Sequence, residues 1–176
     1  MRIRNNAGFS LGELITIMGI LLVLAAIAIP NFIEWRSKAQ VSRAARDVYS
    51  SLQKAKVEAV RRNQLCGITF RDAENDIVVY VETDLPPYGY DGDDIVINIL
   101  EWSDYPGVSL DTARGGGDGL NFANPDRGIV FGHDGLPRND SDNLASGAVF
   151  LIGPGGERQN TVTITPAGSI QIDHSG

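Results

Sequence analysis

Cysteine and histidine are scarce in this chain of 176 residues, and their scarcity excludes several kinds of site. The only cysteine is Cys66, so an intramolecular disulfide and every multi-cysteine zinc or iron–sulfur site are excluded. The two histidines, His133 and His174, lack the spacing of a metal-binding pair. No Gly-x-Ser-x-Gly elbow and no phosphate-cradling loop occurs either. The composition therefore predicts no catalytic residue and no cofactor, with Cys66 as a small buried hydrophobe and His133 in a surface turn.

Basic side chains are few beyond residue 62. Residues 1–62 carry ten Lys or Arg against four Asp or Glu, whereas residues 63–176 carry five against eighteen. The net charges of the two parts are therefore +6 and −13, which sum to the total of −7. An acidic surface repels phosphate groups, so nucleic acid and anionic lipid are disfavoured as partners of the distal part.

One long apolar run is present, from Leu14 to Ile29, and Pro30 closes it. Counted from Phe9, the segment would form about 31 Å of helix, which matches a bilayer core of about 30 Å. An ordinary signal peptide cut after Ala28 and an uncleaved signal anchor are both compatible with this run. Neither explains Glu13, because a carboxylate inside a membrane segment costs free energy and usually marks a partner or a function.

The residues around the start of this run carry a family resemblance. Residues 8–13 read GFSLGE, and with the apolar helix that follows they resemble the class III signal of type IV pilins and type II secretion pseudopilins. The resemblance implies that a prepilin peptidase cuts after Gly8 and methylates the new terminal amine of Phe9. It also implies that Glu13 pairs with the terminal amine of an adjacent subunit. Gly12 departs from the usual aliphatic residue and weakens the local helix by about 1 kcal/mol.

Helical periodicity continues beyond the apolar run. Pro30 lies where such helices commonly carry a proline, and it predicts a kink or local melting. An apolar stripe then follows at spacings of three and four residues, and the helix should end near Asn63. The stripe comprises Val41, Ala45, Val48, Leu52, Ala55 and Ala59. The basic residues off the stripe are interpreted as a solvated face, with contacts to acidic heads of neighbouring subunits as the alternative.

Beyond residue 64 the chain consists of short β-branched runs separated by Gly, Asp, Asn and Pro, which predicts an antiparallel β head. No helix-length periodic segment separates the runs, so a parallel α/β sheet is not supported and the fold class is α+β. The glycine-rich residues 115–119 are interpreted as a flexible loop. The predicted strands are residues 65–70, 77–82, 95–101, 128–131, 148–152, 162–165 and 169–172.

The order of these elements resembles one pilin subfamily. Residues 44–64, 128–138 and 162–172 are similar to the GspH/FimT-like minor pseudopilins and minor pilins, whereas residues 83–127 match no pattern. The resemblance implies a type IV pilin-like fold, with a long N-terminal helix packed on a β-rich head. Some members of the group serve DNA uptake with an arginine-bearing motif. The corresponding residues 168–171 read GSIQ and contain no arginine, which argues against that role.

Two acidic stretches contain oxygen ligands of the kind that Ca²⁺ takes, Asp91–Asp94 and Asn139–Asn143. Neither completes an EF-hand loop, because the required glycine and the distal glutamate are missing. Both are interpreted as solvated turns, and no metal ligand is predicted.

Together, these resemblances imply a structural minor pseudopilin of a type II secretion system and not an enzyme. Residues 1–8 would be the leader, 9–29 the transmembrane and assembly helix, 30–63 its amphipathic extension and 64–176 a periplasmic head. Its partners would be other pseudopilins or pilins, the prepilin peptidase and the inner-membrane secretion platform. A minor type IV pilin and an exported soluble β-rich binding domain are the alternatives.

Overall fold

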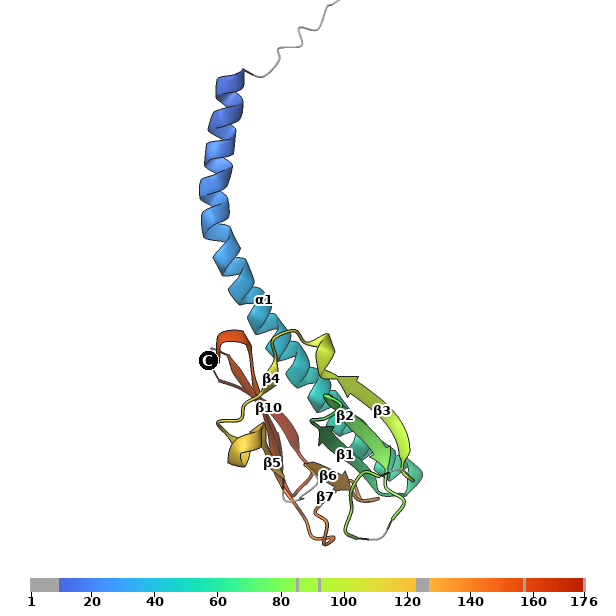
Figure 1. The fold of residues 1–176 in the computed structure, drawn as a ribbon. Coiled ribbons are helices and arrows are strands. Elements are labelled where there is room, and N and C mark those ends of the chain that lie inside the picture. The colour runs from blue at the N-terminus through green and yellow to red at the C-terminus, as the bar shows by residue number, and fades with distance from the viewer. Residues whose placement is uncertain (1–9, 85, 92, 123–126, 157, 176) are drawn as a thin grey trace, which may run out of the picture. The chain divides into compact units, whose positions relative to one another are not determined.

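The computed structural model describes residues 10–84, 86–91, 93–122, 127–156 and 158–175. In this part of the chain, a 52-residue helix, α1 (Leu11–Arg62), precedes a series of strands (Figure 1). The chain divides into two compact units, Met1–Arg36 and Ser37–Gly176. In the first unit, the helix from Leu11 onward leaves nearly every side chain exposed. By length and composition alone, α1 is apolar enough to cross a membrane.

The second unit is organised around the predicted apolar stripe of α1. All six stripe residues and Ala44 are fully buried, which confirms the stripe. The helix ends at Arg62, and the next residue, Asn63, has a φ of +54°. There the amide of Gln64 donates to the carbonyl of Ala59, and that of Asn63 donates to the carbonyl of Val60. These two bonds form a Schellman motif, in which asparagine tolerates the left-handed conformation better than most residues.

The head contains two sheets, and every pairing among its described strands is antiparallel. The predicted α+β fold is therefore confirmed. The first sheet has the order β3 (Ile95–Glu101), β2 (Asp76–Val81), β1 (Cys66–Arg71), β6 (Gly128–Phe131) and β7 (Pro137–Arg138). The second has the order β10 (Ile170–Ser175), β9 (Gln159–Ile164), β8 (Gly147–Ile152) and β4 (Ser109–Leu110), with β5 (Leu120–Phe122) also paired to β8.

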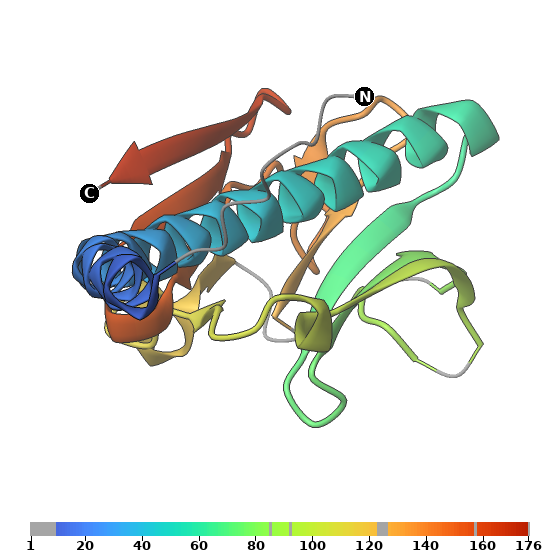
Figure 2. The same ribbon diagram turned by 90° about the horizontal axis from the view of Figure 1, so that it is seen from above.

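A single apolar core joins the helix to both sheets. Its members include Leu52 of α1, Ile68 of β1 and Phe131 of β6 on one side, and Leu151 of β8 and Ile164 of β9 on the other. Figure 2 shows this part of α1, in cyan, with strands of both sheets along its length. Burial of one helix face against two sheets is the main apolar contribution to the stability of this unit.

All seven predicted strands are present, with shifts of up to three residues at their ends. The sequence pattern missed β4, β5 and β7, which are only two or three residues long. Strands this short have no readable alternation, and they form because β6 and β8 offer free edges to pair with. Residues 115–119 form a turn with non-helical backbone angles, in which Gly115, Gly116, Gly117 and Gly119 have positive φ.

The segment after β2 folds back over the first sheet. Strand β2 is buried at every position, although only Ile77, Val79 and Val81 belong to the central core. Tyr80, on the opposite face, lies against Tyr90, with ring centroids 5.2 Å apart. Gly67 of the neighbouring strand leaves room for the Tyr80 ring, since a Cβ there would lie 2.3 Å from its Cζ. Part of the stretch that matched no sequence pattern therefore covers this sheet.

Candidate functional site

Glu13, the predicted assembly residue, lies in the first turn of α1. Its Oε2 accepts a 2.9 Å hydrogen bond from the backbone amide of Ser10, and its own amide donates to Ser10 Oγ at 3.2 Å. This reciprocal pair is a capping box, which satisfies amides that the start of a helix leaves free. The negative charge also lies at the positive end of the helix dipole. Glu13 therefore has a structural partner within its own chain.

Gly8 and Phe9, the predicted cleavage and methylation residues, lie outside the described residues. Pro30 lies inside α1, and the helix continues through it, so local melting at this position is not observed. The predicted kink stays a prediction.

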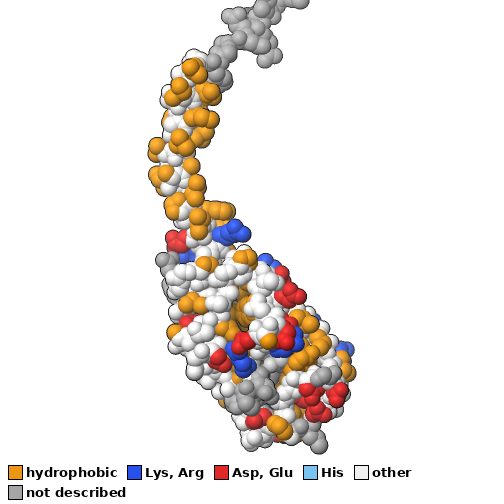
Figure 3. All heavy atoms as spheres, viewed as in Figure 1, with side chains coloured by type: hydrophobic (Ala, Val, Ile, Leu, Met, Phe, Trp, Pro, Cys, Tyr) orange, Lys and Arg blue, Asp and Glu red, His pale blue; other side chains and the backbone are white. Residues whose placement is uncertain are grey.

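The N-terminal part of α1 presents an apolar surface on all sides. Large aliphatic and aromatic residues from Leu11 to Trp35 are exposed by 43% or more. Figure 3 shows hydrophobic side chains, in orange, along this part of the helix. Exposure of this much contiguous apolar area is unfavourable in water, so this part of α1 requires lipid or other helices around it. The surface is continuous around the helix.

Several basic side chains of α1 bind the chain's own head, which corrects the interpretation of a wholly solvated face. Lys56 Nζ donates to the carbonyl of Gly168 at 2.8 Å, and Lys54 Nζ donates to Asn98 Oδ1 at 3.2 Å. Arg43 lies over the ring of Tyr105, 5.3 Å from its centroid. These contacts connect the helix to turns and strands of both sheets. No local sequence pattern predicts these contacts, because the hydrogen-bond partners of Lys54 and Lys56 lie 44 and 112 residues away in the chain.

Tyr105 also connects the head to α1. Its hydroxyl donates to Asp47 Oδ2 at 2.7 Å, and its side chain is only 2% exposed. Burial and the adjacent Asp47 carboxylate raise the pKa of Tyr105. The phenol is therefore neutral at physiological pH and remains a hydrogen-bond donor.

The acidic stretch Asp91–Asp94 is organised by its own backbone amides. Asp94 accepts from the amides of Thr83 and Asp91, and Asp91 accepts from the amide of Asp93. The buried Glu82 accepts from two further amides in the same loop. Burial raises the pKa of Glu82 and of Asp94, so their charged forms are disfavoured.

The second acidic stretch is organised in the same way. Asn139 Oδ1 accepts from the amides of Ser141 and Asn143. Within the described residues no group of three or more His, Cys, Asp or Glu side chains converges in a way that could hold a metal ion. Both stretches are therefore turns closed by side-chain acceptors.

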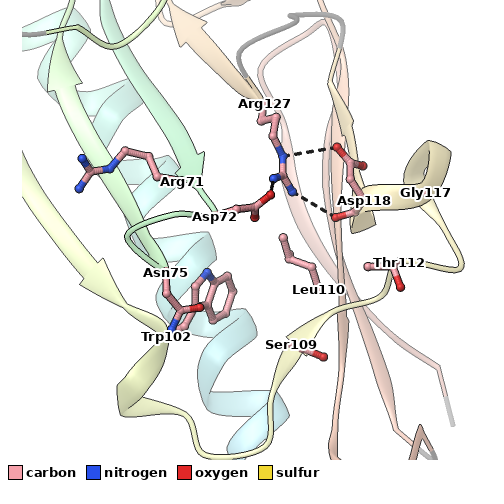
Figure 4. A pocket seen from close by; sticks show the side chains of 10 residues that line it. All are labelled: Arg71, Asp72, Asn75, Trp102, Ser109, Leu110, Thr112, Gly117, Asp118 and Arg127. Atoms are coloured by element: carbon pink, nitrogen blue, oxygen red, sulfur yellow. Dashed lines mark hydrogen bonds and ion pairs between the residues drawn. The ribbon is translucent and has the colours of Figure 1, made fainter.

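A hollow of about 410 Å³ lies between the ends of the two sheets. Figure 4 shows Arg127 at its edge, between Asp72 from the β1–β2 turn and Asp118 from the 115–119 turn. Arg127 forms an ion pair with Asp72, and its Nε lies 3.4 Å from Asp118 Oδ2 without hydrogen-bond geometry. Trp102 and Leu110 also line the hollow. Because the guanidinium is already shared by two carboxylates, the cluster joins the two sheets and offers no free positive charge to an anion.

Cys66 and His133 lie where the sequence indicated. Cys66 is fully buried and unpaired, and burial raises the pKa of its thiol to about 11. His133 is exposed, and His174 Nδ1 lies 2.9 Å from Asn160 Oδ1. Two further features were missed by the sequence interpretation. Ser10 had a readable signal, the Ser-x-x-Glu pattern of a capping box, whereas the Arg127 cluster joins distant segments and had none.

Comparison with known proteins shows the family of this chain. A family model described as type II transport protein GspH matches residues 44–168. The minor pseudopilin EpsH of the type 2 secretion system of Vibrio cholerae has a TM-score of 0.55 at 16% identity, over 78% of this chain and 98% of that one. The type IV minor pilin FimU of Pseudomonas aeruginosa has a TM-score of 0.55 at 12% identity, over 79% and 92%. No curated protein matches the chain. At such low sequence identity, these structural matches show a shared type IV pilin-like fold and nothing more.

Proposed function

The chain belongs to the GspH family of type II transport proteins, and we propose that it is a structural minor pseudopilin of a bacterial type II secretion system. The observation that carries the proposal is the exposed apolar surface of α1 from Leu11 to Trp35, on a chain whose second compact unit, Ser37–Gly176, contains a folded β-rich head. A helix of this kind needs lipid before assembly and neighbouring helices after it. The protein would act by packing and not by catalysis.

Assembly would begin with processing of the N-terminus. In this proposal a prepilin peptidase cuts after Gly8 and methylates the amine of Phe9. The capping box would survive the cut, because it uses only the backbone amides and side-chain oxygens of Ser10 and Glu13. The Glu13 carboxylate has further acceptor positions, since an ionised carboxylate has about four lone-pair sites. It is thus able to accept from the terminal amine of a neighbouring subunit as well.

The protein would be a single-pass component of the inner membrane with its head in the periplasm. Its partners would be other pseudopilins, the prepilin peptidase and the inner-membrane secretion platform. The head, with a net charge of −13 over residues 63–176, would present an acidic surface to partner heads.

A minor type IV pilin is the second candidate, and the similarity to FimU favours it to the same degree in fold. DNA uptake is a weaker version of this candidate. Residues 168–171 contain no arginine and the head is acidic, whereas phosphate contacts supply most of the affinity for DNA. Titration of labelled DNA at low salt tests it, and salt-sensitive binding would favour the DNA-uptake role.

The N-terminus of the protein isolated from its native membrane tests the proposal directly. Intact mass and the N-terminal peptide should give a chain that begins with methylated Phe9. A terminus at Ile29 would instead indicate an exported soluble domain cut after Ala28, and the proposed roles of Glu13 and the helix would be withdrawn. A strain lacking the protein separates the two machines. Loss of protein export with normal pili supports the secretion system, and the reverse result supports the pilus.

A further inference from the structure

The apolar surface of α1 does not end at Pro30. Phe32, Ile33 and Trp35 are exposed by 60%, 62% and 63%, as much as the aliphatic residues before the proline. Phe32 and Trp35 lie on the same face of the helix, with ring centroids 5.8 Å apart. The helix continues unbroken through Pro30, so these aromatic side chains extend the membrane-compatible surface by more than one turn.

The order of side chains at this end is that of a membrane interface. Tryptophan is enriched where the hydrocarbon core meets the headgroups, because its ring is apolar and its N–H needs a polar partner. Arg36 follows Trp35 directly, and a guanidinium there is placed to bind lipid phosphates.

Two positions of the helix in the bilayer can be compared by length. The hydrocarbon core is about 30 Å thick, or twenty helical steps of 1.5 Å. A core from Phe9 to Ile29 places Glu13 about 6 Å inside the hydrocarbon and leaves Phe32, Ile33 and Trp35 about 4.5, 6 and 9 Å outside its other edge, without hydrocarbon around them. A core from Ile15 to Trp35 covers these three side chains and places Glu13 about 3 Å outside the opposite edge.

The second position is favoured by the free energy of the polar side chains. It moves the carboxylate of Glu13 out of the hydrocarbon, where a charged group is unfavourable. The same position places the neutral amide of Asn31 about 6 Å inside the other edge of the hydrocarbon. Glu34 lies one helical step, about 1.5 Å, inside that edge, so its carboxylate is able to reach the headgroups. It also covers the apolar area of Phe32 and Ile33.

We propose that, before assembly, α1 lies in the bilayer with Trp35 at the periplasmic headgroup interface and Glu13 at the cytoplasmic one. This inference rests on the proposed function, since it assumes a membrane-inserted helix. The Ser10–Glu13 capping box would then lie among headgroups and not in hydrocarbon. The carboxylate would be available to the amine of an incoming subunit without the cost of leaving a buried position.

Tryptophan depth in lipid vesicles tests this position. The chain has two tryptophans, so Trp102→Phe leaves Trp35 as the only one in the full-length protein. Phosphatidylcholine and phosphatidylglycerol vesicles with nitroxide quenchers at shallow or deep acyl positions then report the depth of Trp35. Two further single-tryptophan variants replace Leu14 or Leu24 by tryptophan in a Trp35→Phe, Trp102→Phe chain.

Trp35 and the tryptophan of Leu14→Trp should both be quenched most by shallow labels, and that of Leu24→Trp most by deep labels. Trp35 emission unaffected by either label, together with deep quenching in Leu14→Trp, would overturn the inference while leaving the membrane anchor intact. Failure of the wild-type protein to float with vesicles would overturn both the inference and the proposed function. If Trp102→Phe does not fold, the difference between wild type and Trp35→Phe gives the same depth signal.

Discussion

Ser10 and Glu13 hydrogen-bond each other reciprocally across the first turn of α1, at 2.9 and 3.2 Å. The glutamate that a pilin-like signal assigns to assembly is therefore also a helix-capping residue. The two roles make different demands on the side chain. Capping needs a hydrogen-bond acceptor, which glutamine also supplies, whereas pairing with an amine needs the negative charge.

Glu13→Gln should separate these two roles. It should keep the helix and the cap, because glutamine accepts the amide of Ser10, but it should strongly reduce incorporation into filaments. Ser10→Ala is the matched control, since it removes the hydroxyl half of the cap, weakens the helix by about 1 kcal/mol and keeps the charge. Cross-linking to partner pilins in the membrane measures incorporation. Normal incorporation of Glu13→Gln would assign this residue to capping alone.

Tyr105→Phe should weaken the attachment of the head to α1. It removes the 2.7 Å hydrogen bond to Asp47 and leaves that carboxylate with one donor fewer. Hydrogen bonds to charged groups contribute about 1.5–3 kcal/mol, so a clear fall in Tm of the detergent-solubilised chain is expected. Tyr49→Phe serves as the control, because Tyr49 is half-buried and its hydroxyl accepts a hydrogen bond from the neutral Gln53 side chain. Equal changes in Tm for the two variants would contradict the assigned role of Tyr105.

Cys66 should be inert to thiol reagents in the folded protein. Burial raises its pKa to about 11, so at pH 8 the thiolate fraction is roughly one in a thousand, and the side chain is inaccessible as well. Labelling with a maleimide should be negligible in detergent and complete in guanidinium chloride. Rapid labelling of the native protein would show that β1 opens readily near the end of α1.

Glu58 makes stability depend on pH in the acid range. Hydrogen bonds from Arg61 and Arg62, at 2.6 and 2.7 Å, lower its pKa from 4.5 to about 2. A carboxyl group with a lowered pKa stabilises the fold above its unfolded pKa, and this contribution is lost as pH falls through the folded value. Glu58→Gln should therefore lower Tm near pH 6, and the difference from wild type should shrink between pH 4.5 and 2.

Glu74→Gln is the control for this titration, because its carboxylate is exposed and lies 4.0 Å from Arg71. It should change Tm little at any pH. A Glu58→Gln difference that persists unchanged at pH 2 would indicate a packing effect and not an ionic one.

Much of α1 was readable from the sequence because helical signals are local. The stripe from Val41 to Ala59 repeats at three and four residues, and each of its members is buried. The end of the helix at Asn63 followed from the loss of that period. The Ser10 cap also has a local signal, because Ser10 and Glu13 form the Ser-x-x-Glu pattern of a capping box.

The head was readable only in part. Its long strands show β-branched composition, but the division into two sheets depends on which strands pair across tens of residues. The same is true of the contact between Arg127 and Asp72, which are 55 positions apart, and of the loop that covers Tyr80. No local pattern in the sequence encodes such contacts.

The sequence by itself determined a long apolar helix with an acidic residue near its start, an amphipathic continuation and a β-rich acidic head. These follow from composition and periodicity, which act between near neighbours in the chain. Only the tertiary structure decided that two sheets share one core beneath α1 and that Lys54 and Lys56 bind the chain's own head. Such contacts form when folding brings distant segments together, and their free energy depends on geometry that no short stretch of sequence contains.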